Sequence, residues 1–180
     1  MVFKRVIICG LCTVLVALSA CSHPDADVRK SSGPSAAYRQ VLRAMYRNTV
    51  PTVSAAALVR ELQQPPAPLL LDARTPAEFR VSHLQGARFV NYDSLATETF
   101  AGVDRRHSVV VYCSVGVRSE RLGERLHALG FQNVRNLYGG LFEWVNEGYP
   151  IYNAAGLTNS VHPYSALWSL WLKRGQKVYE

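Results

Sequence analysis

The chain has 180 residues, of which 48% are hydrophobic and 18% charged, a composition that suits one globular domain with short extensions and not two full domains. Its formal charge of +7 is spread along the chain without a run of basic residues, so it indicates a surface that mildly favours anionic partners or lipid headgroups and implies no nucleic acid. After the first 20 residues there is no Cys-x-x-Cys, no His cluster with metal-ligand spacing and no glycine-rich nucleotide fingerprint, so we expect neither a metal nor a cofactor.

Residues 1–20 are typical of a secretory signal peptide. A basic start, Lys4-Arg5, precedes an apolar stretch over 6–17 that is too short to span a bilayer comfortably. The segment that follows, Leu18-Ser19-Ala20-Cys21, resembles a bacterial lipobox. This resemblance implies that Cys21 becomes a diacylated N-terminus and that the protein is exported and lipid-anchored to a bacterial membrane, facing the periplasm or the cell exterior. An ordinary signal peptidase site near Ala20 is the alternative.

The tether and the first elements of the domain are predicted from local patterns. Residues 21–34 are rich in Ser, Asp, Pro and charge, and they indicate a flexible tether. A short helix is expected over 38–46, a brief strand at 52–53, and a helix that Ser54 caps and that runs to about Leu62. Leu69-Leu70-Leu71 is a fully apolar run, as in a buried parallel strand.

Asp72 and Arg74 come directly after this apolar run. The next residues, Thr75-Pro76-Ala77-Glu78, form a capping box with proline at the first helical position. Asp72 and Arg74 therefore lie at the C-terminal end of a strand, where open α/β sheets place their sites. Further along, the pattern predicts a strand and a loosely patterned helical stretch, at residues 88–90 and 94–103.

The β-branched run over 109–111 leads to Cys113, and a short loop with Gly116 then leads to Arg118 and an amphipathic helix. This order predicts a reactive-thiol site. The thiolate is the nucleophilic form, and backbone N–H groups, a helix N-terminus and a cation all stabilise it. Gly116 lets the loop curl so that its amides face inward, and Arg118 adds a planar donor fork. The expected anion-binding loop consists of Ser114, Val115, Gly116, Val117 and Arg118. A buried structural cysteine is the alternative.

The helix after this loop is expected to end at Gly130, and Gly123 within it indicates a close approach to the sheet. A last strand is expected over 133–137. Gly139-Gly140 then indicates a tight turn into a helix whose Trp144 fills the core.

Five motifs in this order resemble the rhodanese (sulfurtransferase) family: residues 70–79, 83–87, the strand with Cys113-x-x-x-x-Arg118, 129–134 and 137–144. The resemblance covers about residues 50–153. It implies an α/β fold with a mostly parallel five-stranded sheet flanked by helices, within a domain that we set at 35–153 together with its N-terminal helix.

The resemblance also implies a chemistry. The Cys113 thiolate would take the outer (sulfane) sulfur from thiosulfate or a polysulfide as a persulfide, and would pass it to cyanide, a thiol or a protein acceptor. Loop amides and Arg118 would stabilise the anionic sulfur. Asp72 and Arg74 would lie near the loop, Asp72 chiefly as a brace and Arg74 either as a brace or in contact with the anionic end of the substrate. His83 is expected in a structural turn and not as a general base.

Cysteine usage agrees with a persulfide. Cys9 and Cys12 leave with the signal and Cys21 takes lipid, so Cys113 remains as the one thiol, without a resolving partner. A Cys21–Cys113 disulfide would be an alternative to this free thiol only if Cys21 were not acylated. Two other functions are possible interpretations. One is a persulfide carrier or polysulfide-binding module with little turnover alone, and the other is a purely structural domain.

Two expectations concern the ligand of the loop. Related phosphatases have one residue more between cysteine and arginine, so we expect no useful phosphatase activity here. Ser114 and Val115 place no positive side chain beside Cys113. One missing charge-assisted hydrogen bond is worth roughly 1.5–3 kcal/mol, or about 10- to 150-fold in affinity, so we expect a high Michaelis constant for thiosulfate and better use of polysulfide or a persulfide.

The rhodanese pattern ends before the extension over 154–180. Four residues after the His162-Pro163 breaker have the spacing of an amphipathic helix: Tyr164, Leu167, Trp168 and Trp171. We expect this helix to pack back on the domain. An interfacial or partner-docking helix is the alternative.

Overall fold

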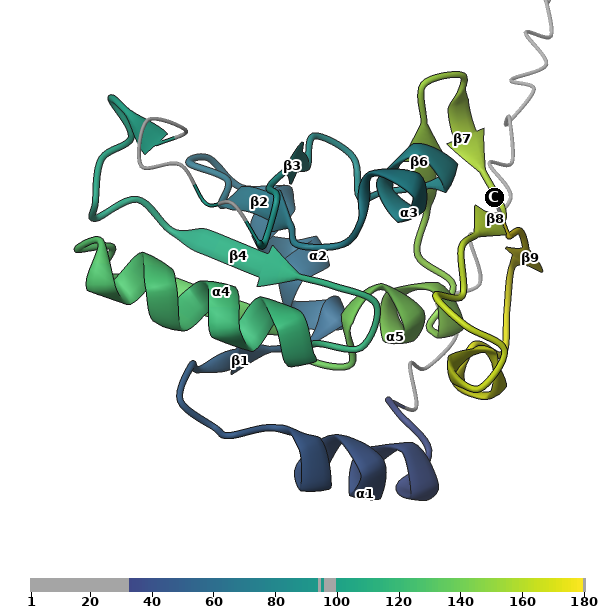
Figure 1. The fold of residues 1–180 in the computed structure, drawn as a ribbon. Helices are drawn as coiled ribbons and strands as arrows, with labels where there is room; N and C mark the ends of the chain where they lie inside the picture. Colours follow the sequence, from purple (N-terminus) through teal and green to yellow (C-terminus); the bar gives the residue numbers. More distant parts are fainter. Residues whose placement is uncertain (1–32, 94, 96–99, 180) are drawn as a thin grey trace, which may run out of the picture. The chain divides into compact units, whose positions relative to one another are not determined.

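A five-stranded sheet, parallel throughout, organises the part of the chain that the computed structural model describes, residues 33–93, 95 and 100–179 (Figure 1). The strands follow the order β1-β5-β4-β2-β3. Their bounds are Thr52–Val53 (β1), Leu69–Asp72 (β2), Arg88–Phe89 (β3), Val109–Tyr112 (β4) and Val134–Leu137 (β5). The predicted α/β class and the five-stranded sheet are therefore confirmed.

Strand β4 lies at the centre, and all four of its residues are buried. It pairs with β2 and β5, with Val109 opposite both Leu69 and Val134. Its alternate side chains enter two separate cores, since Val109 and Val111 pack on one face of the sheet and Val110 and Tyr112 on the other. Burial on both faces explains why the sequence of this strand is apolar without alternation.

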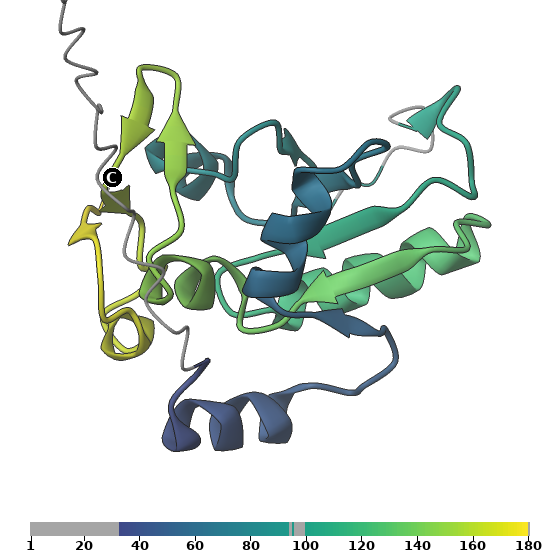
Figure 2. The ribbon, with the colours of Figure 1, turned by 180° about the vertical axis from the view of Figure 1, so that it is seen from behind.

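Helices cover both faces. Helix α4, Val117–Ala128, packs on one face, and its Leu122 and Leu126 share the core of Val109 and Val111 (Figure 1). Helices α2, Ala55–Leu62, and α5, Gly140–Asn146, contribute to the opposite core, on the face that Figure 2 turns toward the viewer. Trp144 of α5 is buried in that core, as predicted.

The predicted caps of α2 and α3 and the predicted stop of α4 at Gly130 are confirmed. Ser54 caps α2 through a hydrogen bond from the Ala57 N–H, and Thr75 and Glu78 form the capping box of α3, Pro76–Val81. Gly130 follows α4 with φ 89°, a conformation that suits glycine. At Gly123 a Cβ would lie 2.9 Å from Val50, so the close approach is to the segment that leads into β1 and not, as expected, to the sheet itself.

Helix α1, Ala36–Met45, is the helix expected over 38–46. Its side chains Tyr38 and Leu42, and Tyr46 just after it, belong to the same core as α2 and α5. Helix α1 and Tyr46 are thus part of the packed domain.

The expected amphipathic helix after His162-Pro163 is wrong. Only one 3-10 turn forms there, η2 at Trp168–Trp171, between strands β8, Ser160–Val161, and β9, Gln176–Lys177, which pair in parallel. The pairing places residues 176–177 beside residues 160–161, and the Asn146 side-chain amide donates to the carbonyl oxygen of Trp171 at 2.9 Å. These tertiary contacts hold the segment in a conformation other than the expected α-helix. The segment does pack back on the domain, because Trp171 stacks on Tyr38 at 5.3 Å between ring centroids.

A hairpin that was not predicted precedes this segment. Strands β6, Ile151–Asn153, and β7, Gly156–Thr158, pair antiparallel, and Tyr152 also bridges to His83 at the end of α3.

Some predictions lie outside the described residues. The signal peptide, Cys21, the tether up to residue 32 and half of the helical stretch over 94–103 (residues 94 and 96–99) belong to this group. None of the described helices combines the length and the apolar character needed to cross a membrane.

Candidate active site

Cys113 lies between the end of β4 and the start of α4. Its sulfur accepts a hydrogen bond from the Gly116 N–H at 3.1 Å, and the thiol is free and only 1% exposed. Gly116 itself has φ 99°, and a Cβ there would lie 1.8 Å from the Tyr46 hydroxyl oxygen. The tight loop therefore requires glycine at 116, for its conformation and for space.

The carbonyl oxygens of the loop are held from outside. The four donors are the Leu141 N–H to Cys113 (2.8 Å), the Phe142 N–H to Ser114 (3.0 Å), the Tyr46 hydroxyl to Val115 (2.7 Å) and the Asn136 amide to Gly116 (2.8 Å). Because N–H and C=O point to opposite sides of a planar peptide, this anchoring turns amide groups of the loop inward. One of them, the Gly116 N–H, already points at the Cys113 sulfur.

Helix α5 approaches this loop closely. A Cβ at Gly140 would lie 2.3 Å from the Cys113 carbonyl oxygen, and the residue has φ 59°. The predicted Gly139-Gly140 turn therefore serves the cysteine loop, because it lets the first amides of α5 reach the loop carbonyls.

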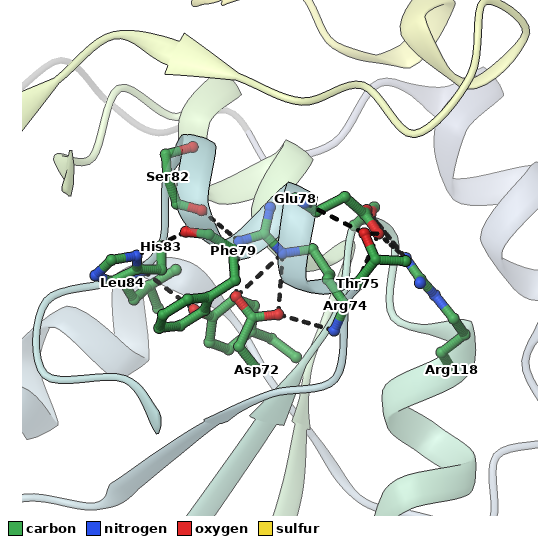
Figure 3. A network of polar contacts seen from close by, with 11 residues as sticks. Asp72, Arg74, Thr75, Glu78, Phe79, Ser82, His83, Leu84 and Arg118 are labelled. Atoms are coloured by element: carbon green, nitrogen blue, oxygen red, sulfur yellow. Dashed lines mark hydrogen bonds and ion pairs between the residues drawn. The ribbon is translucent and has the colours of Figure 1, made fainter. Parts of the chain in front are cut away.

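Arg118, on the first turn of α4, is paired with a carboxylate that the sequence analysis did not assign to the site. Its Nη2 lies 3.1 Å from each carboxylate oxygen of Glu78 and donates to the Ser114 hydroxyl at 3.2 Å (Figure 3). Burial opposes the charge of Arg118, but Cys113 and Glu78 act in the other direction and hold its pKa above the ordinary value. Arg118 thus lies beside Cys113, with its charge partly compensated.

Glu78 is buried, and its hydrogen bonds connect helix α3 to the cysteine loop. It accepts hydrogen bonds from the Thr75 backbone N–H at 3.0 Å and from the Ser114 hydroxyl at 2.5 Å. Burial alone would raise its pKa, but the charge of Arg118 and the donated hydrogen bonds keep the pKa below the ordinary value of 4.5. The carboxylate is therefore stabilised in its charged form.

Glu78→Gln should make the protein less stable at neutral pH, by about 1.5–3 kcal/mol, because Arg118 and Ser114 lose a charged acceptor. A depressed carboxyl pKa contributes stability that is present above the unfolded value and is lost as pH falls through the folded value. The stability difference between wild type and variant should therefore shrink as pH is lowered below 4.5. Urea unfolding at several pH values measures it. Glu124→Gln, at a more exposed carboxylate paired with Arg47, is the matched control. A difference that stays constant with pH would contradict this role.

Asp72 and Arg74 form a second, fully buried ion pair beneath the loop. The Arg74 Nη2 lies 2.6 Å from the Asp72 Oδ2, and its Nε lies 3.0 Å from the Oδ1 (Figure 3). The same guanidinium donates to the carbonyl oxygen of Ser82, at the end of α3. Burial opposes the charge on Arg74, but Asp72 outweighs it and holds the pKa above the ordinary value.

This geometry bears on the two expectations for Arg74. Neither side chain of the Asp72–Arg74 pair is exposed at all, so the structure favours Arg74 as a brace over Arg74 in contact with a substrate. Asp72 and Arg74 connect β2 to the end of α3. His83 likewise lies in a turn, where its Nδ1 is 2.9 Å from the Phe79 carbonyl oxygen and its ring stacks on Phe79 at 4.1 Å.

A cavity of about 170 Å³ gives access to Cys113. It is lined by Met45, Cys113, Ser114, Val115, Val117, Arg118, Tyr164 and Trp168. The cysteine, Ser114, Val115, Val117 and Arg118 were predicted for the site, and the structure brings them together around one cavity. Met45, Tyr164 and Trp168 were not assigned to it. The helical spacing of Tyr164 and Trp168 indicated that they share a face, but not what that face would contact.

A family model for the rhodanese-like domain matches residues 54–147. The chain belongs to the rhodanese-like domain family. Among curated relatives, this rhodanese-like protein is 31% identical over 94 residues to thiosulfate sulfurtransferase 18 of Arabidopsis thaliana, covering 45% of this chain and 69% of the relative. It is 32% identical over 92 residues to the tRNA uridine(34) hydroxylase of Hamiltonella defensa, covering 48% of this chain and only 26% of the hydroxylase.

The solved structures agree with the family. The thiosulfate sulfurtransferase from Pseudomonas aeruginosa superposes with a TM-score of 0.53 at 25% identity, over 60% of this chain and 20% of that one. The rhodanese-like domain thus corresponds to a fraction of these larger proteins. The family match, residues 54–147, contains the Cys113 loop, Glu78 and Arg118, whereas Met45, Tyr164 and Trp168 lie outside it.

Proposed function

We propose that this protein is a lipid-anchored sulfurtransferase of the rhodanese type, which moves sulfane sulfur from thiosulfate or polysulfide through a persulfide on Cys113 to a thiophilic acceptor. The observation that carries the proposal is the hydrogen bond from the Gly116 N–H to the Cys113 sulfur at 3.1 Å, at the wall of a cavity that Arg118 also lines. Relatives named as sulfurtransferases support this class of reaction.

In the proposed reaction, the Cys113 thiolate attacks the sulfane sulfur of the donor. A new S–S bond forms to Cys113, the original S–S bond breaks, and sulfite or a shortened polysulfide leaves with the electron pair. The acceptor, for example cyanide, then attacks the outer sulfur of the persulfide. Thiocyanate leaves and the Cys113 thiolate is restored, so the cycle needs no oxidant, reductant or proton abstraction from the nucleophile.

The protein contributes electrostatic stabilisation to each step. Negative charge resides on sulfur before and after the transfer, and the inward amides of the loop and Arg118 are the groups that can stabilise it. Because the loop carbonyls are anchored by donors outside the loop, these amides need no rearrangement when the donor arrives. Glu78 compensates part of the Arg118 charge, which adds to the expectation that a doubly charged donor such as thiosulfate binds weakly.

Intact-mass spectrometry tests the first half-reaction. After incubation with thiosulfate or polysulfide, the wild-type protein should gain the mass of one sulfur atom, and cyanide should remove it. A Cys113→Ser variant treated in parallel should gain nothing. Equal gain by the variant would place the sulfur elsewhere and overturn the proposal.

A persulfide carrier that turns over poorly alone is the second candidate, and the buried position of Cys113 favours it. Loading in the mass experiment without steady-state thiocyanate production would support the carrier. Loading with sustained turnover would support the enzyme.

Membrane anchoring through Cys21 is part of the proposal and rests on the sequence Leu18-Ser19-Ala20-Cys21. Cys21→Ala should move the protein from the membrane fraction to soluble material or uncleaved precursor, because acyl chains supply the buried methylenes that hold it. Fractionation with metabolic labelling by a palmitate analogue measures this. A variant whose signal is cleaved and that still stays in the membrane without the label would contradict acylation as the anchor.

A further inference from the structure

The cavity over Cys113 has walls from two parts of the chain. The cysteine loop and α4 form its inner end, and Met45, Tyr164 and Trp168 form the outer wall. These three residues lie outside the family match at 54–147, so the outer wall belongs to this chain's own flanking segments. Met45 ends helix α1, and the two aromatic residues come from the extension.

The outer wall is apolar. Besides these three residues, Val115 and Val117 line the cavity, and its polar groups among the described residues belong to Cys113, Ser114 and Arg118, with the Tyr164 hydroxyl and the Trp168 indole N–H on otherwise apolar rings. A cavity of about 170 Å³ has room for a small hydrocarbon group, since apolar protein cavities of about 150 Å³ can hold benzene. Such a surface contributes nothing to the binding of a small inorganic dianion.

Arg118 is the one cationic side chain among the described residues that line this cavity, and an aromatic ring covers it while a carboxylate compensates its charge. The Tyr164 ring lies over the Arg118 guanidinium, with 4.9 Å between the guanidinium carbon and the ring centroid, and Glu78 holds the Nη2 of the same group. An incoming anion therefore meets a cation that already has a carboxylate and an aromatic face as partners. This arrangement favours a donor with a single negative charge.

The outer wall is also fixed in place. Tyr164 has φ 65°, a conformation that side-chain-bearing residues seldom adopt, and its N–H donates to the His162 Nδ1 at 3.1 Å. On the far side of η2, Trp171 stacks on Tyr38, and the Asn146 side chain accepts from the Lys173 N–H at 2.7 Å. The two aromatic residues are thus positioned before any ligand arrives.

We propose that Met45, Tyr164 and Trp168 form a subsite for an apolar substituent, so that the preferred donor is a monoanionic organic sulfane and not inorganic thiosulfate. This inference rests on the proposed sulfur transfer through Cys113. With an alkyl thiosulfonate, a bond forms from the Cys113 sulfur to the sulfane sulfur, the bond from that sulfur to the sulfonyl sulfur breaks, and the alkyl sulfinate leaves with the electron pair. The sulfane sulfur keeps its oxidation level.

Methanethiosulfonate and butanethiosulfonate are matched probes, since their reacting groups and charges are the same and only the alkyl length differs. A buried methylene changes kcat/KM by about fourfold, so three fully buried methylenes give an upper bound of about sixtyfold. We expect the wild type to prefer the butane compound at least about tenfold. Trp168→Ala and Tyr164→Ala should each reduce this ratio severalfold.

Leu167→Ala is the control, because Leu167 belongs to the same segment, is 71% exposed and does not line the cavity. It should keep the wild-type ratio. Thermal unfolding of each variant checks that it is folded, and Tyr164→Phe, which keeps the ring, should retain the preference if Tyr164→Ala proves unstable. A wild-type ratio near one, or a ratio that both alanine variants leave unchanged, would overturn the subsite while thiosulfate loading of Cys113 still supported sulfur transfer. Failure of every donor to load Cys113 would instead overturn the proposed function.

Discussion

Cys113→Ser should reduce sulfur transfer to the background rate, a loss of at least about a thousandfold, while the fold stays intact. The serine oxygen is smaller than the sulfur, so it introduces no clash, and it can accept the hydrogen bond that the Gly116 N–H now gives to Cys113. It cannot form a persulfide, however, so the transfer has no covalent route. The loss is therefore chemical and not structural.

A thiocyanate assay and far-UV circular dichroism test the two halves of this prediction on the same preparation. Ser169→Ala is a suitable control substitution, since its exposed hydroxyl bonds only to a carbonyl of its own turn, and it should leave the rate unchanged. Sulfur transfer retained by Cys113→Ser would contradict the assignment of Cys113.

Asp72→Asn should lower the free energy of unfolding by about 3–5 kcal/mol, the range measured when one partner of a buried ion pair is removed. Arg74 is fully buried, and after the substitution its hydrogen-bond acceptors among the described residues would be uncharged: the new amide oxygen at position 72 and the Ser82 carbonyl oxygen. The guanidinium cannot give up its proton to avoid the cost of an unpaired buried charge.

Urea unfolding followed by circular dichroism measures this loss. Asp104→Asn is the matched control, because Asp104 also accepts from a backbone N–H two residues on and pairs with an arginine, but on the surface. It should leave the unfolding midpoint nearly unchanged. An Asp72 variant as stable as the wild type would show that the Asp72–Arg74 pair does not brace the sheet against α3.

Local patterns predicted most of the fold. The buried strands, the caps of α2 and α3 and the loop from Cys113 to Arg118 depend on residues a few positions apart, so their signals are contained in short stretches of sequence. The positive φ of Gly116 is also predictable from a short stretch of sequence, because the loop between strand and helix is too short for another residue type to close it.

The parts of the site that were not predicted depend on residues that are far apart in sequence. Thr75-Pro76-Ala77-Glu78 was correctly interpreted as a capping box, yet that pattern contains no information that the same carboxylate pairs with Arg118, 40 positions later. The expected C-terminal helix failed for a related reason. Its apolar spacing reflects contacts with α1 and with the Cys113 cavity, and those contacts are equally compatible with a 3-10 turn.

The anchoring of the cysteine loop has a consequence for where the working unit of this protein begins. The family match starts at residue 54, but the Tyr46 hydroxyl binds the Val115 carbonyl at 2.7 Å and accepts from the Gly139 N–H at 3.1 Å. This one phenol thereby joins the loop that carries the sulfur to the turn that leads into α5. A fragment that began at residue 54 would keep Cys113 but lose the Tyr46 hydroxyl that holds the cysteine loop, so the smallest competent fragment must extend back at least to Tyr46, directly after α1.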